Sequence, residues 1–187
     1  MQYRLQTPLK RSDLAPLQAG DTVLLSGVVY TARDAAHARM MELLDAGRPL
    51  PFPIEGAAIY YVGPTPERPG CAIGAAGPTT SGRMDAYTPR LLDLGLACMI
   101  GKGKRNEAVK ASVVKNGAVY LGAIGGAGAL MARSVQSCKV IAWPDLGCEA
   151  VRRLVVQDFP LTVLLDPHGG DLYRSGPAAY LASRSTV

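Results

Sequence analysis

The feature that most constrains the fold is an alternation of short apolar runs with segments of helical periodicity. The run 22–30, TVLLSGVVY, is rich in β-branched residues and predicts a strand. The next segment, TARDAAHARMMELLDAG, predicts a helix with Thr31 as N-cap, Asp34 as the acid of a capping box, and Gly47 at the C-terminal end. Strands that alternate with helices in this way favour an α/β domain with a mixed sheet.

The alternation continues along the chain. A helix over 84–95 is expected to be shortened or kinked by Pro89, and a helix over 106–117 is expected to be capped by Asn106 and stopped by Gly117. A short helix is expected over 128–135 and a turn over 166–171, whereas residues from about 174 to 187 read as a loosely held tail of a single domain, 1–187. Further strands are expected at 57–63, 71–77, 96–101, 118–126, 138–143, 152–159 and 161–166.

Composition narrows the function classes. Hydrophobic residues make up 48% of the 187 residues, but no apolar run approaches the ~18 residues that span a bilayer. The N-terminal segment MQYRLQTPLK lacks the apolar stretch of a secretory signal, so we expect a cytoplasmic protein without a membrane segment.

The net charge of +5 comes from scattered, mostly arginine residues, and aromatic residues make up only 6%. A small anionic ligand explains this pattern at least as well as nucleic acid does.

Metal and nucleotide motifs are absent from the sequence. The four cysteines, Cys71, Cys98, Cys138 and Cys148, form no C-x-x-C pair, so we expect no metal site, and Cys98 reads as a buried core thiol. The segment GAIGGAGAL does not fit G-x-G-x-x-G, and GLACMIGKGK does not fit the P-loop pattern. Tight turns and close backbone packing explain the glycines of 122–128.

Basic residues stand where helices are expected to begin, although the positive end of the helix dipole disfavours them there by ~0.3–1 kcal/mol each. Arg33 lies in the first turn of one helix and Arg83 at the start of another, and Lys102, Lys104 and Arg105 precede a third. Free N–H groups and a guanidinium together form a clamp for a carboxylate. The segment 77–85, GPTTSGRMD, adds hydroxyl groups and is expected to bind a carboxylate or a phosphate. Its hydroxyl residues are Thr79, Thr80 and Ser81.

The same segments resemble the β domain of class I, iron–sulfur-dependent fumarases. GPTTSGRMD is very similar to a motif of that family, and SGVVYTARDAAHARM, PFPIEGAAIYYVGPTP, GKGKRNEAVKASVVKNGAVYLGAIGGAGALMA and PDLGCEAVRRLVVQDFPLTVLLDPHG resemble its other segments. The resemblance covers nearly the whole chain. It implies a swivelling β/β/α fold, which is compatible with the mixed sheet expected above.

The resemblance also implies a site. Arg33 of ARDAAH, Thr79 and Arg83 of GPTTSGR, and Lys102 of GKGKR are expected to reach the substrate, with Thr79 as candidate base. His37, one helical turn after Arg33, is expected to orient Arg33, with Thr80 and Ser81 in supporting positions. The loop KGKR departs from the lysine-glycine-asparagine of many long-form fumarases, which leaves the role of Lys104 open.

The resemblance implies either the C-terminal half of a long enzyme or a separate β subunit. From the length of the chain we expect the β subunit of a two-subunit hydro-lyase that interconverts fumarate and L-malate. The α partner is expected to hold a [4Fe-4S] cluster, and an assembly such as α2β2 is expected. An L-tartrate dehydratase β subunit, or the β subunit of another 2-hydroxyacid hydro-lyase, is the alternative, although Gly82 and the basic loop favour fumarase. A non-catalytic anion-binding or RNA-binding module is the alternative from another class.

Overall fold

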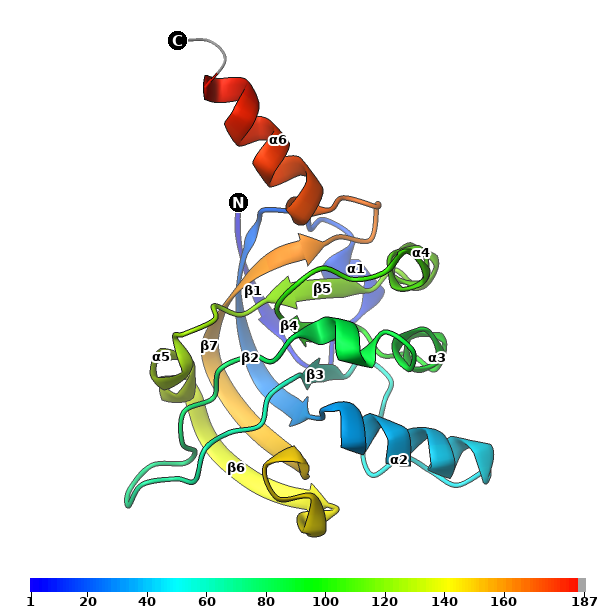
Figure 1. The fold of residues 1–187 in the computed structure, drawn as a ribbon, viewed down its shortest axis with the longest axis vertical. Helices are drawn as coiled ribbons and strands as arrows, with labels where there is room; N and C mark the ends of the chain where they lie inside the picture. The colour runs from blue at the N-terminus through cyan, green and yellow to red at the C-terminus, as the bar shows by residue number, and fades with distance from the viewer. Residues whose placement is uncertain (185–187) are drawn as a thin grey trace.

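The computed structural model describes residues 1–184 as seven strands surrounded by helices (Figure 1). The strands are β1 (Gln2–Gln6), β2 (Thr22–Thr31), β3 (Ala58–Tyr60), β4 (Cys98–Gly101), β5 (Val119–Gly122), β6 (Val135–Ala142) and β7 (Val151–Leu165). The α-helices are α1 (Arg11–Leu14), α2 (Asp34–Asp45), α3 (Thr88–Asp93), α4 (Glu107–Asn116), α5 (Gly128–Arg133) and α6 (Leu172–Arg184). Two 3-10 helices are η1 (Ser81–Met84) and η2 (Pro144–Glu149).

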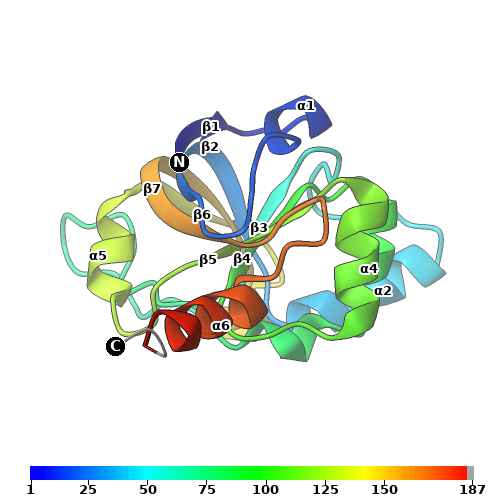
Figure 2. The same ribbon diagram turned by 90° about the horizontal axis from the view of Figure 1, so that it is seen from above.

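Two long antiparallel strands, β2 and β7, organise the sheet. Strands β2, β3, β4 and β5 are parallel neighbours, β5 pairs antiparallel with β7, and β7 pairs back onto β2, so these five strands close on themselves. Strand β1 pairs with the beginning of β2, and β6 pairs with the beginning of β7. Figure 2 shows the closed arrangement from above. This mixed sheet with flanking helices fits the expected swivelling β/β/α fold.

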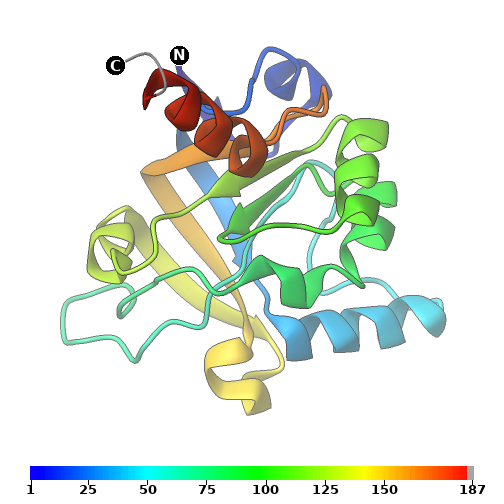
Figure 3. The same cartoon turned by 45° about the horizontal axis from the view of Figure 1, so that its top comes forward.

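Side chains of the central strands alternate between two cores, as the two-residue period of a strand requires. Tyr60 and Ile100 belong to the core enclosed by the sheet, whereas their neighbours Ile59 and Met99 belong to a second core. The second core also contains residues of α2, α3 and α4, which lie together on one side of the sheet, away from α5 (Figure 3). The central strands are therefore buried on both faces.

Most predicted elements are present. The strand over 22–30 and the helix over 106–117 are confirmed, and the Asn106 side chain accepts a hydrogen bond from the Val109 amide as an N-cap. Gly117 ends α4 in the left-handed conformation, as expected. The strands predicted over 152–159 and 161–166 form one continuous strand, β7, and Pro160 lies between the parts that pair with β6 and with β5.

Three local predictions are wrong. Residues 71–77 do not form a strand, because their hydrogen bonds close a loop in which the Thr65 and Ala75 backbones pair. The N-cap of α2 is Arg33 and not Thr31, and Asp34 is the first residue of the helix. The Thr31 hydroxyl instead joins β2 to β7 through the Ala150 carbonyl and the Arg152 amide. The helix predicted over 84–95 begins only at Thr88, with a proline in its first turn.

The C-terminal segment forms a helix that the sequence did not indicate. Helix α6 extends away from the body of the molecule in Figure 1 and has no buried residue. The part of the expected tail over 185–187 lies outside the described residues. No helix among residues 1–184 is both long enough and apolar enough to cross a membrane.

Candidate functional site

The loops that carry the predicted site residues leave the same end of the sheet. Strands β2, β3, β4 and β5 are parallel, so their carboxyl ends lie together, and their arrowheads line up in Figure 1. Arg33 follows β2, Lys102 follows β4, and the glycine-rich segment 122–128 begins at the end of β5. Ligand sites of α/β sheets commonly lie at this end of the strands.

The segment 78–81 joins this sheet end through its backbone. The Thr79 amide donates a hydrogen bond to the Tyr61 carbonyl at 2.8 Å, which places Thr79 directly beyond β3. Thr80 and Lys102 form an isolated parallel bridge, and the Ser81 amide donates to the Lys102 carbonyl at 2.9 Å. The structure therefore places the backbone of segment 79–81 beside Lys102.

Ser81 is fully buried and ties three segments together. Its Oγ lies 2.8 Å from the hydroxyl of Tyr120, which also contacts the Gly103 carbonyl at 3.0 Å. A Cβ at Gly101 would collide with the Ser81 Oγ, so only glycine permits this close approach at the end of β4. Ser81 thus supports the loop from behind, whereas Thr80 is exposed.

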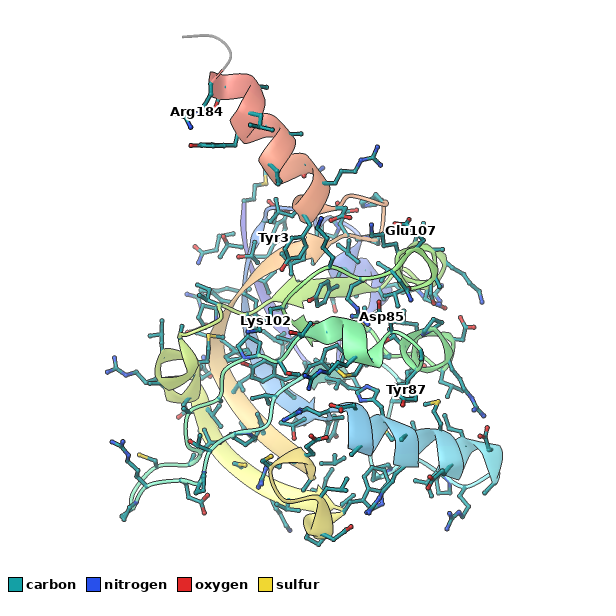
Figure 4. The ribbon with its side chains drawn as sticks, in the orientation of Figure 1. Tyr3, Asp85, Tyr87, Lys102, Glu107 and Arg184 are labelled. Carbon is teal, nitrogen blue, oxygen red and sulfur yellow. The ribbon has the colours of Figure 1, made fainter. Side chains whose placement is uncertain are left out.

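Arg83 and Lys102 present exposed charges at this end of the sheet. Arg83 lies on η1, which contacts α2, the helix that begins after Arg33. Figure 4 shows Lys102 and Asp85 near η1. Within residues 1–184 neither Arg83 nor Lys102 forms an ion pair, so both cations are available to an anion.

A buried ion pair fixes the loop of Lys102 to the loop of Arg83. The Arg105 Nε lies 2.5 Å from the Asp85 carboxylate, and the Asp85 carboxylate also accepts from the Asn106 amide at 2.7 Å. The Arg105 guanidinium lies over the rings of Tyr61 and Tyr120, at 5.5 Å and 5.0 Å. Arg105 is only 4% exposed and therefore holds the scaffold rather than a ligand. The sequence grouped it with the ligand-binding cations because burial is not visible there.

Arg33 differs from Arg83 because it is already paired. Its Nη2 lies 2.9 Å from Oε1 of Glu149 and 3.6 Å from Oδ1 of Asp34, and its side chain is 19% exposed. These two carboxylates explain how a cation is tolerated at the N-cap of α2. The sequence did not indicate Glu149, because it lies far along the chain at the end of η2.

His37 packs directly beneath Arg33. The ring is fully buried, its Nδ1 lies 2.8 Å from the Arg33 carbonyl, and Tyr61 and Tyr87 contact it at centroid distances of 5.4 Å and 5.8 Å. Burial lowers the pKa of His37 from 6.5 to about 4, so the ring is neutral at pH 7. The neutral ring donates from Nδ1, and its buried Nε2 has no hydrogen-bond partner among the described residues.

The cysteines of this chain do not assemble into a metal site. No group of three or more His, Cys, Asp or Glu side chains within residues 1–184 is placed to hold a metal ion. Cys98 is buried in the core, as expected, and burial raises the pKa of its thiol. The described part of the chain therefore offers no ligand set that fits an iron–sulfur cluster.

Comparison with known proteins identifies the family. The family model described as "Fumarase C-terminus" matches residues 1–176, which include every element up to the first turns of α6. This chain belongs to that family. The match covers all four residues predicted to reach substrate, and it agrees with the swivelling β/β/α fold.

Individual relatives are of two lengths. The chain is 40% identical over 165 residues to "Fumarate hydratase 2" of Leishmania major and 38% identical over 174 residues to "Fumarate hydratase class I, anaerobic" of Escherichia coli. It covers only 29% and 32% of those proteins, although 87% and 91% of this chain is matched. It is 37% identical to "Putative L(+)-tartrate dehydratase subunit beta" of Methanocaldococcus jannaschii, with 88% of both chains covered. The chain thus spans about a third of the fumarases and most of a β-type subunit.

Proposed function

We propose that this chain is the β subunit of a hydro-lyase that interconverts fumarate and L-malate in the cytoplasm. The convergence of Arg33, Thr79, Arg83 and Lys102 at the carboxyl ends of the parallel strands carries the proposal. Two exposed cations that form no ion pair within residues 1–184, beside Arg33, which is paired with Glu149, suit a small dianion.

These residues would bind and polarise the substrate. Arg33, Arg83 and Lys102 hold the two carboxylates, and Arg83 and Lys102 also offset the negative charge that develops when the C3 proton of malate leaves. Thr79 lies beside this charge as the candidate base. A hydroxyl is too weak a base by itself, so it depends on the neighbouring cations to stabilise its deprotonated form.

The remaining part of the site would come from another chain. The described residues offer no ligand set for a cluster, so we assign the [4Fe-4S] cluster to an α partner, in an assembly such as α2β2. The Methanocaldococcus relative is named as a β subunit, which supports a partner of this kind. Ile124 and Leu130 are 64% and 51% exposed on the segment that follows β5, and Ile124 adjoins Gly125, which lies beside Lys102, so this segment supplies apolar surface for docking.

L-Tartrate dehydration is the second candidate reaction. It is supported by the Methanocaldococcus relative, which bears the name of an L(+)-tartrate dehydratase β subunit and is 37% identical to this chain. The two reactions share the carboxylate-binding groups, so only substrate preference separates them.

The test is activity of the reconstituted pair. Co-expression with a cluster-bearing α-type chain, followed by assays with fumarate, L-malate and L-tartrate, is expected to show hydratase activity that neither chain has alone. Arg83→Lys is expected to reduce turnover on the order of 10²-fold, because a point charge cannot replace a bidentate fork. Arg90→Lys is the matched control, since Arg90 is exposed and pairs with Asp45 on α2.

Two results would contradict the proposal. Near-normal turnover of the Arg83→Lys pair would remove Arg83 from the site. Absence of any hydro-lyase activity, together with RNA binding that weakens steeply with salt, would favour a non-catalytic module instead.

A further inference from the structure

Glu149 contacts Arg33 and therefore lies next to the candidate site. Oε1 of Glu149 lies 2.9 Å from Nη2 of Arg33, and Oε2 accepts a hydrogen bond from the Ala35 amide at 3.2 Å. One carboxylate therefore bridges the guanidinium and the first turn of α2. Both side chains are about one-fifth exposed, so the contact lies at the edge of the site rather than in open solvent.

The Arg33 side chain also packs against backbone at Gly63. A Cβ at Gly63 would lie 2.9 Å from Nη1 of Arg33 and 3.3 Å from its Cδ. The Arg33 carbonyl is fixed in turn by the Nδ1 of His37. Arg33 is thus held by the carboxylate of Glu149 and by the bare backbone at Gly63, and its Nε is buried without a hydrogen-bond partner among residues 1–184.

The segment that delivers Glu149 is itself attached to α2. The Arg39 guanidinium binds the Asp145 carboxylate through two hydrogen bonds of 3.0 Å and 2.5 Å, and it lies 6.0 Å from the Trp143 ring. The η2 segment therefore packs along α2 at two points. Only the point at Glu149 reaches a predicted substrate-binding residue.

Two roles for Glu149 are chemically distinct. A carboxylate that substrate must displace would compete with the ligand for Arg33, whereas a carboxylate that stays would orient the fork. Oε2 of Glu149 is bound to the backbone of α2, and Oε1 contacts only Nη2 of the guanidinium, which has five N–H donors in all. Both facts favour a carboxylate that stays in place while a ligand binds the exposed edge.

We propose that Glu149 is a positioning residue for Arg33. Because Gly63 has no side chain, the guanidinium has room for the position in which Glu149 holds it. The proposal rests on the function proposed above, in which Arg33 binds a substrate carboxylate. Removing Glu149 lets the guanidinium leave its place, which weakens carboxylate binding in the ground state and transition state alike. Such a change raises KM and leaves kcat nearly unchanged.

The experiment compares variants in the assembled α–β enzyme. Glu149→Ala is expected to raise KM for the dicarboxylate by roughly 10-fold to 10²-fold, the range of a misplaced positioning group, with kcat nearly retained. Glu149→Gln keeps one acceptor oxygen and is expected to lie between wild type and Glu149→Ala. Gly63→Ala displaces the flexible end of Arg33 and is expected to raise KM in the same way.

Asp145→Ala is the matched control, because it removes the other attachment of η2 to α2 without touching Arg33, and its KM is expected to be that of wild type. Succinate, a four-carbon dicarboxylate that cannot react, supplies a readout besides activity. Its dissociation constant is expected to follow KM across the variants, and thermal unfolding of each variant checks the fold.

The outcomes separate the two proposals. Wild-type enzyme that binds succinate without any hydro-lyase activity refutes the proposed reaction, while the effect of Glu149→Ala on succinate affinity still tests the positioning role. Unchanged KM and succinate affinity in Glu149→Ala would overturn that role. Tighter binding would also overturn it, because it would identify Glu149 as a competitor of the substrate.

Discussion

The buried His37 ring predicts a specific dependence of stability on pH. Burial is the main reason why the pKa of His37 is about 4 in the folded chain, against 6.5 for an unperturbed histidine, and the charge of Arg105 lowers it further. The Arg33 carbonyl and Asp34 oppose this change in part. The unfolded chain therefore binds a proton between these two pKa values, whereas the folded chain does not.

The sign and size of the effect follow from linkage. Stability is fully present above pH 6.5 and is lost as pH falls toward 4, because protonation favours the unfolded chain in this interval. At about 1.4 kcal/mol per pKa unit, the difference corresponds to roughly 3 kcal/mol. This is a large part of the 5–15 kcal/mol typical of a domain, so it is measurable.

The assay is urea unfolding of the isolated chain at a series of pH values. The free energy of unfolding of wild type is expected to fall steadily from pH ~6.5 to pH ~4.5. His37→Gln is expected to be less stable at neutral pH but nearly flat across this interval, because it has no titrating group at this position. Hydrogen bonds lower the pKa values of the carboxylates of Asp21, Asp93 and Asp145 below the ordinary 3.8. The stability that these carboxylates contribute is therefore lost mainly at lower pH than the interval in which His37 acts.

Two results would refute the reasoning. A wild-type stability that is flat between pH 6.5 and 4.5 would show that His37 remains protonatable in the folded chain. A His37→Gln variant whose stability falls as steeply as that of wild type would assign the slope to other groups. In either case the assignment of a neutral His37 ring that is protonated on Nδ1 would be incorrect.

Four further predictions concern the scaffold of the site and the isolated chain. Arg105→Ala is expected to cost about 3–5 kcal/mol in urea unfolding, because it leaves Asp85 buried without its partner. Gly101→Ala is expected to cost about 1–3 kcal/mol in the same assay, because its Cβ displaces Ser81. Asn106→Ala removes the N-cap of α4 and is expected to lower stability by about 1 kcal/mol, again by urea unfolding. Iron and sulfide added to the isolated chain are expected to give no stable cluster by visible absorption.

The strand and helix pattern was predictable where local signals and burial agree. The apolar runs of β4 and β5 are almost fully buried, and the α4 caps at Asn106 and Gly117 are local signals that the structure retains. The predictions of secondary structure failed where contacts between distant parts of the chain determine the local structure. Thr31 has the side chain of an N-cap, but its hydroxyl joins β2 to β7, and the α2 helix begins later.

The candidate site divides in the same way. Motif resemblance and the misplaced helix-start charges indicated Arg33, Arg83 and Lys102, and their loops do leave one end of the sheet. The charge signal did not distinguish Arg105 from Lys102, because the sequence does not show that Arg105 is buried between two tyrosine rings. Glu149 has no local signal at all, since only the pairing of β2 with β7 brings η2 to the start of α2.

The distribution of ion pairs explains how the chain can be stable while some of its cations have no carboxylate partner among residues 1–184. Arg105 is paired and buried, and it fixes the two loops before any ligand arrives. Arg83 and Lys102 are exposed and form no ion pair within residues 1–184, so they contribute little to folding and keep their charge for an anion. Arg33 is intermediate, because it is paired with Glu149 but its side chain is still 19% exposed. A fold held by buried contacts therefore presents cations that a ligand and a second chain would neutralise.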